Sequence, residues 1–316
     1  MKNLFRRRSS REEGWLAISM QPGVLNFAHG ARDSAGKCSI TRCGTRAMDA
    51  AFKDADRVAK ELGVDRYRCL TLLAPDEYQL LLVEAPNVPP AELKTAVRWR
   101  VKDMLDYHVE DATIDVLDIP PDPASSSAHR AHSMYAVAAR NEVIRGCIGR
   151  FEAAHIPLSV IDIGETAQRN IAALFEPAGR GLAFLYVKAA HALLTINFAG
   201  ELYLARRIDV TADQLAGPSD AAQQDAKDRI LLELQRSFDH FDRQFPFVGL
   251  AKLMLGPEPE DTGLAGYLSQ NLGIPVGQAR LDDVLRIDPQ AVLGGDAEWR
   301  LFHVLGAALR SEAKAL

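Results

Sequence analysis

Gly30, Gly36 and Lys37 come closest in this sequence to a phosphate-binding loop. In the motif Gly-x4-Gly-Lys-Ser/Thr, backbone N–H groups hold the phosphates and the hydroxyl holds Mg²⁺. Here the first glycine lies one residue too far from the second, and Cys38 stands where the hydroxyl belongs. No Gly-x-Gly-x-x-Gly sequence occurs either, so neither of these nucleotide-binding fingerprints is present.

Residues that could bind a metal or act as nucleophiles are also poorly spaced. The cysteines at 38, 43, 69 and 147 form no Cys-x-x-Cys pair, so a zinc site is not expected. His129 and His132 lie in a stretch rich in Pro, Ser and Ala, which predicts a loop. Asp239, His240 and Asp242 fall on a predicted helix, where neighbouring residues point in different directions. No Gly-x-Ser-x-Gly turn occurs, so the sequence gives no nucleophile for a serine hydrolase of this type.

Length and composition indicate a globular protein with reduced thiols. At about 150 residues per domain, 316 residues predict two domains or one two-lobed unit. Apolar residues make up 47% and charged residues 25%, with a net charge of −5, which gives no argument for binding nucleic acid. The basic start has no apolar stretch behind it, and no run reaches the roughly 18 apolar residues of a membrane helix. We therefore expect a cytoplasmic location.

The apolar periodicity predicts two halves, each with a sheet and helices. In the first half we expect strands on both sides of a Pro22-Gly23 turn, a helix over 46–62, and a strand over 78–84 that is apolar enough to be central. A helix over 90–105, strands over 113–119, 133–139 and 158–163, and a helix over 141–154 follow. After a linker at 176–181, the pattern predicts three antiparallel strands within 182–208, a long helix over 219–245, a strand over 250–255 and a final helix over 297–312.

The order of these elements resembles the PilM/MshI family of type IV and MSHA pilus biogenesis proteins, which belongs to the actin-like ATPase superfamily. The resemblance covers nearly the whole chain and is most specific in residues 82–106, a strand, a proline-rich turn and a helix. Weaker matches lie at 157–163, 200–208, 233–241 and 304–310. It implies an α/β, two-lobed actin-like ATPase (ribonuclease H-like) fold with mixed sheets flanked by helices. It also implies a basic tail at 1–11, a first lobe with an inserted subdomain at 12–175, and a second lobe at 176–316 whose final helix packs back toward the hinge.

The same resemblance implies a degenerate nucleotide cleft that lacks the residues for Mg²⁺ and phosphate binding. The two positions that carry Mg²⁺-organising aspartates in the superfamily hold Ala17 and Tyr186, and close-approach glycines are replaced by Ser19 and Lys188. The lysine of the first hairpin corresponds to Val24, and the adenosine-side glycine pair is reduced to the single Gly256. The implied protein is a non-catalytic scaffold in which ATP and Mg²⁺ are not expected. An ATP-binding hydrolase or phosphotransferase is the alternative.

Two residues of this cleft allow opposite interpretations. Lys188 could hold an anion without Mg²⁺, although an exposed hairpin end is the simpler expectation. Asp162 is the acidic residue kept on a strand that faces the cleft, and it could instead cap the helix that follows Gly164.

The family resemblance implies a membrane-bound partner. The expected partner is the cytoplasmic tail of a PilN/MshJ-like inner-membrane protein, and an assembly ATPase is a further candidate partner. The second alternative function is a scaffold of a type II secretion system, similar to GspL. Trp99 lies about 200° from Val97 on the predicted helix, off the core stripe, so Trp99 with Arg98 and Arg100 is the candidate docking surface. Arg6, Arg7 and Arg8 could contact an anionic membrane or form a solvated tail. The expected location is therefore peripheral, at the inner membrane.

Overall fold

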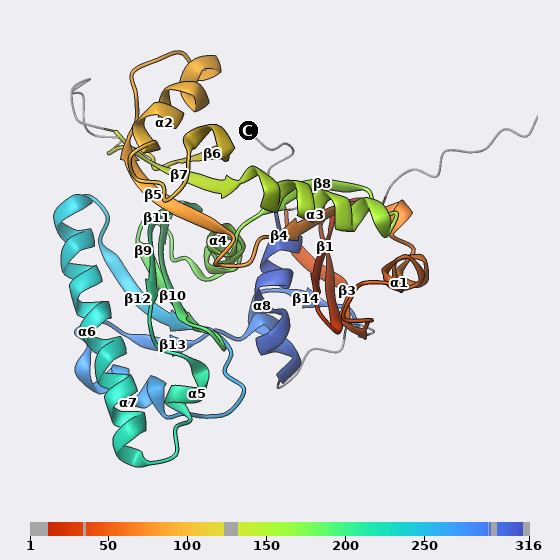
Figure 1. Cartoon of the computed structure of the whole chain (residues 1–316). Coiled ribbons are helices and arrows are strands. Elements are labelled where there is room, and N and C mark those ends of the chain that lie inside the picture. Colours follow the sequence, from red (N-terminus) through yellow and green to blue (C-terminus); the bar gives the residue numbers. More distant parts are fainter. Residues whose placement is uncertain (1–11, 34–35, 123–131, 290, 292–295, 312–316) are drawn as a thin grey trace, which may run out of the picture.

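Two larger sheets and one small sheet organise the chain (Figure 1). The computed structural model describes residues 12–33, 36–122, 132–289, 291 and 296–311. The basic residues Arg6, Arg7 and Arg8 and the loop residue His129 lie outside these ranges. None of the helices in the described part of the chain combines the length and apolarity needed to cross a bilayer.

The first sheet has the strand order β14-β3-β2-β1-β4-β8. Its strands are β1 (Trp15–Gln21), β2 (Val24–Arg32), β3 (Cys38–Ala47), β4 (Arg68–Leu72), β8 (Leu158–Asp162) and β14 (Arg286–Ile287). Alternation along β1 directs Leu16 and Ile18 toward α1 (Ala55–Leu62) and α3 (Asn141–Ala153), and Trp15 and Ala17 toward the opposite face. That opposite face packs on α4 (Gly164–Phe175) and α8 (Asp296–Ala308).

The second sheet has the order β11-β10-β9-β12-β13 and lies on the other side of α4 and α8 (Figure 1). The meander β9 (Gly181–Val187), β10 (Ala192–Phe198) and β11 (Glu201–Ile208) is antiparallel, as predicted, and β12 (Leu250–Leu255) and β13 (Val276–Gln278) add in parallel. Helix α6 (Asp220–Gln244) covers its outer face through Ile230, Leu234 and Phe241. The short helices α5 (Ala212–Leu215) and α7 (Leu264–Asn271) complete this lobe.

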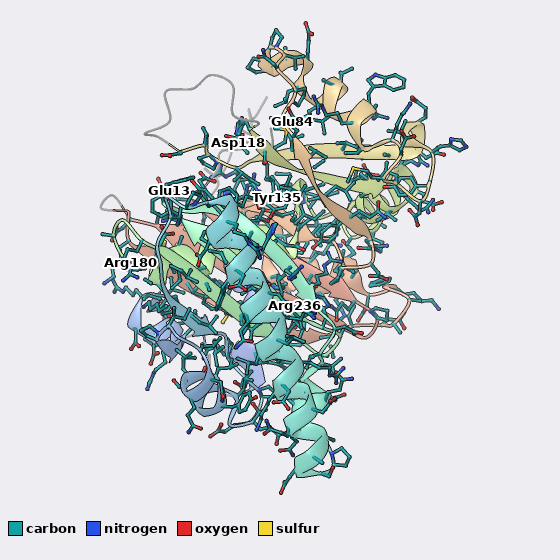
Figure 2. All side chains as sticks on the ribbon, turned by 90° about the vertical axis from the view of Figure 1, so that its left-hand side faces the viewer. Glu13, Glu84, Asp118, Tyr135, Arg180 and Arg236 are labelled. Atoms are coloured by element: carbon teal, nitrogen blue, oxygen red, sulfur yellow. The ribbon has the colours of Figure 1, made fainter. Side chains whose placement is uncertain are left out.

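The small sheet, β5 (Tyr78–Glu84), β7 (Ser133–Arg140) and β6 (Ala112–Asp118), is inserted between β4 and β8 of the first lobe and carries α2 (Leu93–Val101) on one face. Its other face packs on the second lobe, where the Tyr135 hydroxyl donates to the Tyr203 carbonyl at 3.4 Å and accepts from the Ala205 amide at 3.1 Å. Figure 2 labels Tyr135 at this junction. The inserted subdomain therefore contacts both lobes.

Two expectations about the elements are wrong, and one strand was not predicted. The segment predicted as a helix from residue 46 begins as strand β3, because helix α1 starts only at Ala55 after a turn in which Phe52 has a φ of 61°. Strand β5 is an edge of the small sheet and not a central strand; α2 covers one face and the second lobe the other, which explains its apolar sequence. Strand β14 returns to the first sheet from late in the chain and has no predicted counterpart.

Candidate functional site

A cavity of about 440 Å³ lies between the lobes, at the cleft that the family resemblance predicts. The β1–β2 hairpin, the end of β4 and helix α3 form its first-lobe walls, and the end of β9 and α8 form its second wall. The cationic side chains in these walls are Arg150, Lys188 and Arg300, with His303 beside them. Gly164, the first residue of α4, also lines the cavity. The site is therefore concave and predominantly basic.

Tyr186 occupies the inner wall of this cavity and is almost completely buried. Its ring lies 4.3 Å from the Phe302 ring and 5.1 Å from the His303 ring, both on α8. Its hydroxyl donates to the Trp299 carbonyl, and burial raises its pKa far above the ordinary value. Gly256 lies directly against it, since a Cβ there would come within 2.8 Å of the ring. The position that the resemblance assigns to the second aspartate is thus part of an aromatic core.

Lys188, the residue directly after β9, is half-buried in the cavity wall. The expectation of an exposed hairpin end is therefore wrong. Burial lowers the pKa of its ammonium to about 8, because removal from water disfavours the charged form; the Glu165 carboxylate raises it and Arg207 lowers it. His191, in the same hairpin, has its pKa lowered to about 4 by burial and by the nearby Lys188 and Arg207.

A buried carboxylate near Lys188 forms polar contacts with residues of both lobes. Glu165 on α4 is 2% exposed, accepts a hydrogen bond from the Tyr78 hydroxyl and pairs with Arg207 of β11 at 3.2 Å. Arg207 also donates to the Pro75 carbonyl, and its guanidinium carbon lies 4.8 Å from the centroid of the Tyr78 ring. The pKa of Tyr78 is raised far above its ordinary value, first by burial and then by Glu165. Segments 75–78, 165 and 207 thus meet in one polar cluster.

The remaining cleft residues from the sequence lie at different depths. Ser19 lines the cavity, whereas Val24 begins β2 outside it. Ala17 is buried in the core on the side of β1 that faces α8, so its position is closed to a ligand.

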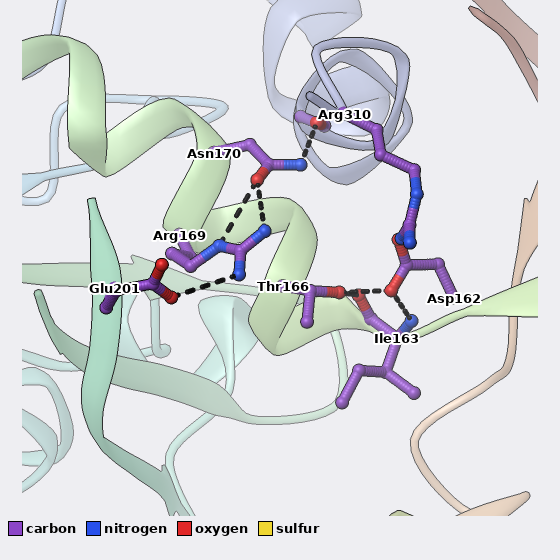
Figure 3. A network of polar contacts seen from close by, with 8 residues as sticks. Asp162, Ile163, Thr166, Arg169, Asn170, Glu201 and Arg310 are labelled. Carbon is purple, nitrogen blue, oxygen red and sulfur yellow. Dashed lines mark hydrogen bonds and ion pairs between the residues drawn. The ribbon is translucent and has the colours of Figure 1, made fainter. Parts of the chain in front are cut away.

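Asp162 belongs to a buried network at the back of the cleft (Figure 3). Its carboxylate accepts from the Ile163 amide at 2.9 Å and from the Thr166 hydroxyl, and pairs with Arg310 at 2.6 Å. The N-cap of α4 is Ile163, so the expected capping role of Asp162 is replaced by this bond to Thr166. In the same network Asn170 donates to the Gly306 carbonyl at 3.0 Å and Arg169 pairs with Glu201 at 3.7 Å. Asp162 is therefore structural.

A second cavity of about 260 Å³ lies beyond Tyr186, on the side where the resemblance places adenosine. Its walls are apolar, with Val187, Leu215 and Trp299, and its rim carries acidic residues, including Glu258 and Glu260. The Trp299 indole donates to the Val187 carbonyl at 2.9 Å, and the Trp299 carbonyl accepts from Tyr186. Tyr186 and Trp299 therefore separate the two cavities: Tyr186 lines the larger one and Trp299 lines the smaller one.

The two positions that the resemblance assigns to Mg²⁺-organising aspartates provide no free carboxylate here. Ala17 provides no oxygen, and the hydroxyl of Tyr186 is already bonded within the protein. In the part of the chain that the structure describes, no group of three His, Cys, Asp or Glu residues is arranged to hold a metal ion. The groups that line the cavity are mainly cationic side chains, and the inner wall is formed by packed aromatic rings.

The predicted docking surface lies on α2, away from this cleft. Trp99 is 59% exposed, so its ring is available in the free protein. Arg98 is not available in the same way, because its guanidinium donates to the carbonyls of Val109 at 2.6 Å and Ala112 at 3.0 Å. Arg100 lies 3.7 Å from Glu84 in an exposed ion pair. Of the three predicted docking residues, Trp99 is thus the one that presents an exposed apolar side chain, while Arg98 and Arg100 contact other groups of the protein.

Comparison with known proteins shows the fold. No protein-family model and no curated protein sequence matches the chain. Among solved structures, the PilM–PilN type IV pilus biogenesis complex matches with a TM-score of 0.68 at 19% identity over 95% of this chain and 98% of that chain. This match confirms the expected fold class, the two-lobed actin-like ATPase fold.

Two further structures match with lower TM-scores. The cytoplasmic domain of EpsL, an inner membrane component of the type II secretion system of Vibrio cholerae, gives 0.47 at 13% identity, over 95% of this chain and 97% of that one. A protein from Bacteroides thetaiotaomicron, described as having an actin-like ATPase fold and unknown function, gives 0.48 at 10% identity, over 87% and 93%.

Proposed function

We propose that this chain is a non-catalytic scaffold of an MSHA-like type IV pilus assembly machine, located at the cytoplasmic face of the inner membrane. Two observations support this proposal: its fold is similar to that of PilM in a complex with PilN, and residues 82–106 resemble the most specific segment of the PilM/MshI family. By this proposal, the scaffold docks the short cytoplasmic tail of a PilN/MshJ-like membrane protein. An assembly ATPase and an anionic lipid surface, reached through Arg6, Arg7 and Arg8, are further proposed partners.

Tyr186 is the observation on which the non-catalytic part of the proposal rests. In an actin-like ATPase this position carries an aspartate that organises Mg²⁺ and water, whereas here its ring packs on Phe302 and its hydroxyl is bonded to Trp299. By this proposal, the loss of that carboxylate removes the group that positions a metal-bound water in the superfamily. The fold would then serve to present surfaces rather than to hydrolyse a nucleotide.

The first prediction is that the purified chain releases no phosphate from ATP in the presence of Mg²⁺. The measurement is a phosphate-release assay on wild-type protein and on Lys188→Ala, a change in the cavity wall. Activity that is identical in both proteins comes from a contaminant. Activity that disappears in Lys188→Ala would favour the alternative, an ATP-binding hydrolase or phosphotransferase.

The second prediction concerns the docking surface on α2. A synthetic tail of the PilN/MshJ-like protein should bind the chain with modest, micromolar affinity, because ordering a short tail has an entropic cost. Trp99→Ala should weaken binding by about 2 kcal/mol, or about thirtyfold, as expected of an aromatic hot spot. Calorimetric titration measures the affinity, and urea unfolding shows whether the variant folds.

Leu232→Ala provides the matched control, because Leu232 is 45% exposed but lies on α6 in the other lobe. It should leave tail binding unchanged. A folded Trp99→Ala protein that binds as tightly as wild type would place the docking site elsewhere in the chain. A tail that does not bind wild-type protein would contradict the scaffold proposal itself.

A further inference from the structure

The smaller cavity, next to Trp299, has an apolar interior and a negatively charged rim. Its volume of about 260 Å³ lies below the roughly 300–1,000 Å³ of sites for drug-sized ligands, so it fits one or two side chains better than a whole nucleotide. Val187 is buried in its wall, and the half-buried Trp299 lies beside it, with the indole N–H bonded to the Val187 carbonyl. The ring of Trp299 thus presents an aromatic surface to a side chain that enters from outside.

Three carboxylates line this cavity: Asp213 of α5, and Glu258 and Glu260 of the segment after β12. Asp213 and Glu260 are exposed, and Glu258 accepts hydrogen bonds from the amide and the hydroxyl of Thr262. None of the three forms an ion pair with a residue that the structure describes, and Lys227 of α6, which approaches the same segment, is not paired with them either. The rim therefore carries a net negative charge that attracts cations.

Residues 1–11 of the sequence combine the two features that such a cavity would bind. Two apolar residues are followed directly by three arginines: Leu4, Phe5, Arg6, Arg7 and Arg8. No acidic residue lies within residues 1–11 to oppose the attraction to the rim. An apolar side chain that enters the cavity would place the arginines after it at the acidic rim, where carboxylates and the edge of an aromatic wall favour a guanidinium.

The position of the cavity favours this segment from a second molecule. The Glu12 amide donates to the Arg66 carbonyl at 2.8 Å, beside the starts of β1 and β4. From there β1 runs toward the larger cavity, where Ser19 lines the wall, so residue 12 lies at the end of the first sheet that is remote from the cleft. The smaller cavity belongs to the second lobe, and Figure 1 shows α5 and β1 on opposite sides of α8.

We propose that the smaller cavity binds residues 4–8 of a second copy of this chain, with Phe5 in the apolar interior and the arginines at the rim. Such a contact joins two different surfaces, so it does not close on itself and would extend into short head-to-tail oligomers. This inference goes beyond the scaffold function and does not depend on tail docking at α2. Because the same arginines are the proposed lipid contact, an anionic membrane would compete with self-association.

The test is sedimentation equilibrium of the full chain, which should associate weakly, in the micromolar range, because ordering a short segment has an entropic cost. Asp213→Lys with Glu260→Lys should weaken the association at least about tenfold, since each change turns an attraction into a repulsion. The matched control is Asp239→Lys with Asp242→Lys, the same charge change at exposed positions of α6 outside the cavity, which should associate as wild type does. A wild-type chain that stays monomeric, or a folded cavity variant that associates like wild type, would overturn the proposal.

A complementary exchange shows whether segment and rim are the two partners. A variant with glutamate at positions 6, 7 and 8 leaves the described residues unchanged and should also associate at least about tenfold more weakly. Mixed with the variant carrying Asp213→Lys and Glu260→Lys, it should form mixed complexes, because its reversed segment matches the reversed rim. If the mixture forms no such complexes, the two surfaces do not bind each other and the proposal is wrong.

Competition on wild-type protein tests the apolar part of the contact and needs no folded variant. A synthetic peptide of residues 1–11 should dissociate the oligomers. The same peptide with Leu4→Ser and Phe5→Ser keeps every charge and should require an at least about tenfold higher concentration, because it has no apolar side chain to bury. Equal potency of the two peptides would contradict insertion into the cavity. Dissociation by adenosine, which carries no charge, would assign the cavity to a nucleoside and would also overturn the proposal.

Discussion

Replacing Gly306 by alanine is expected to destabilise the protein by about 3 kcal/mol or more, the upper range for overpacking a close contact. Gly306 lies in α8, and a Cβ there would come within 2.1 Å of the Ala167 carbonyl oxygen on α4. That oxygen belongs to the backbone, so neither helix can accommodate the methyl group by a side-chain rotation. Because α4 and α8 separate the two large sheets, their displacement would disturb both lobes.

Urea unfolding followed by circular dichroism measures this loss. Gly146→Ala is the matched control, because Gly146 also lies in a helix, α3, but a Cβ there meets only the tip of Arg150 at 3.9 Å. That variant should be as stable as wild type or up to about 1 kcal/mol more stable, since alanine favours the helix. If Gly306→Ala unfolds at the wild-type urea concentration, α4 and α8 are not packed as closely as described.

Removing the guanidinium of Arg310 should destabilise the protein by about 3–5 kcal/mol, the typical loss when one partner of a buried ion pair is deleted. Arg310 lies 2.6 Å from Asp162, and their side chains are only 11% and 7% exposed. Arg310→Met keeps the length of the side chain but leaves the carboxylate buried without its cation. The urea midpoint should therefore fall strongly.

Two further variants show whether the effect belongs to the pair. Asp162→Asn combined with Arg310→Met should recover part of the lost stability, because it also removes the unpaired charge. Arg236→Met, which breaks the exposed pair with Glu233 on α6, should change the midpoint very little. If Arg310→Met is as stable as wild type, the network of Figure 3 does not hold the chain end against β8.

The elements with strong periodicity could be predicted from the sequence, and those set by distant contacts could not. Helix α6 and the β9–β11 meander have clear apolar patterns, and their observed bounds lie close to the predicted ones. Strand β3 was missed because its buried Cys38 and Ile40 are followed by a polar stretch, while the alanines after residue 47 mimic helical spacing. The continuous apolar run of β5 does not distinguish a central strand from an edge strand that is covered on both faces, because both have buried side chains on each face.

The candidate site could be predicted only where the family resemblance gave a position. Ser19, Tyr186 and Lys188 do line the cavity, but the burial of Lys188 depends on neighbours that no spacing reveals. Glu165 and Arg207 were missed as a pair, since they are far apart in sequence and join different lobes. The only local signal was Glu165 itself, an acidic residue inside an apolar segment.

The hydroxyl of Tyr135 has a consequence for how molecules of this protein meet one another. Strand β11 is an edge of the second sheet, and such an edge presents free N–H and C=O groups that can pair with a strand of another molecule. By bonding the Tyr203 carbonyl and the Ala205 amide, Tyr135 occupies one donor and one acceptor in the middle of this edge. The inserted subdomain thereby blocks the pairing of β11 with a strand of another molecule, and with it the aggregation that such pairing would cause.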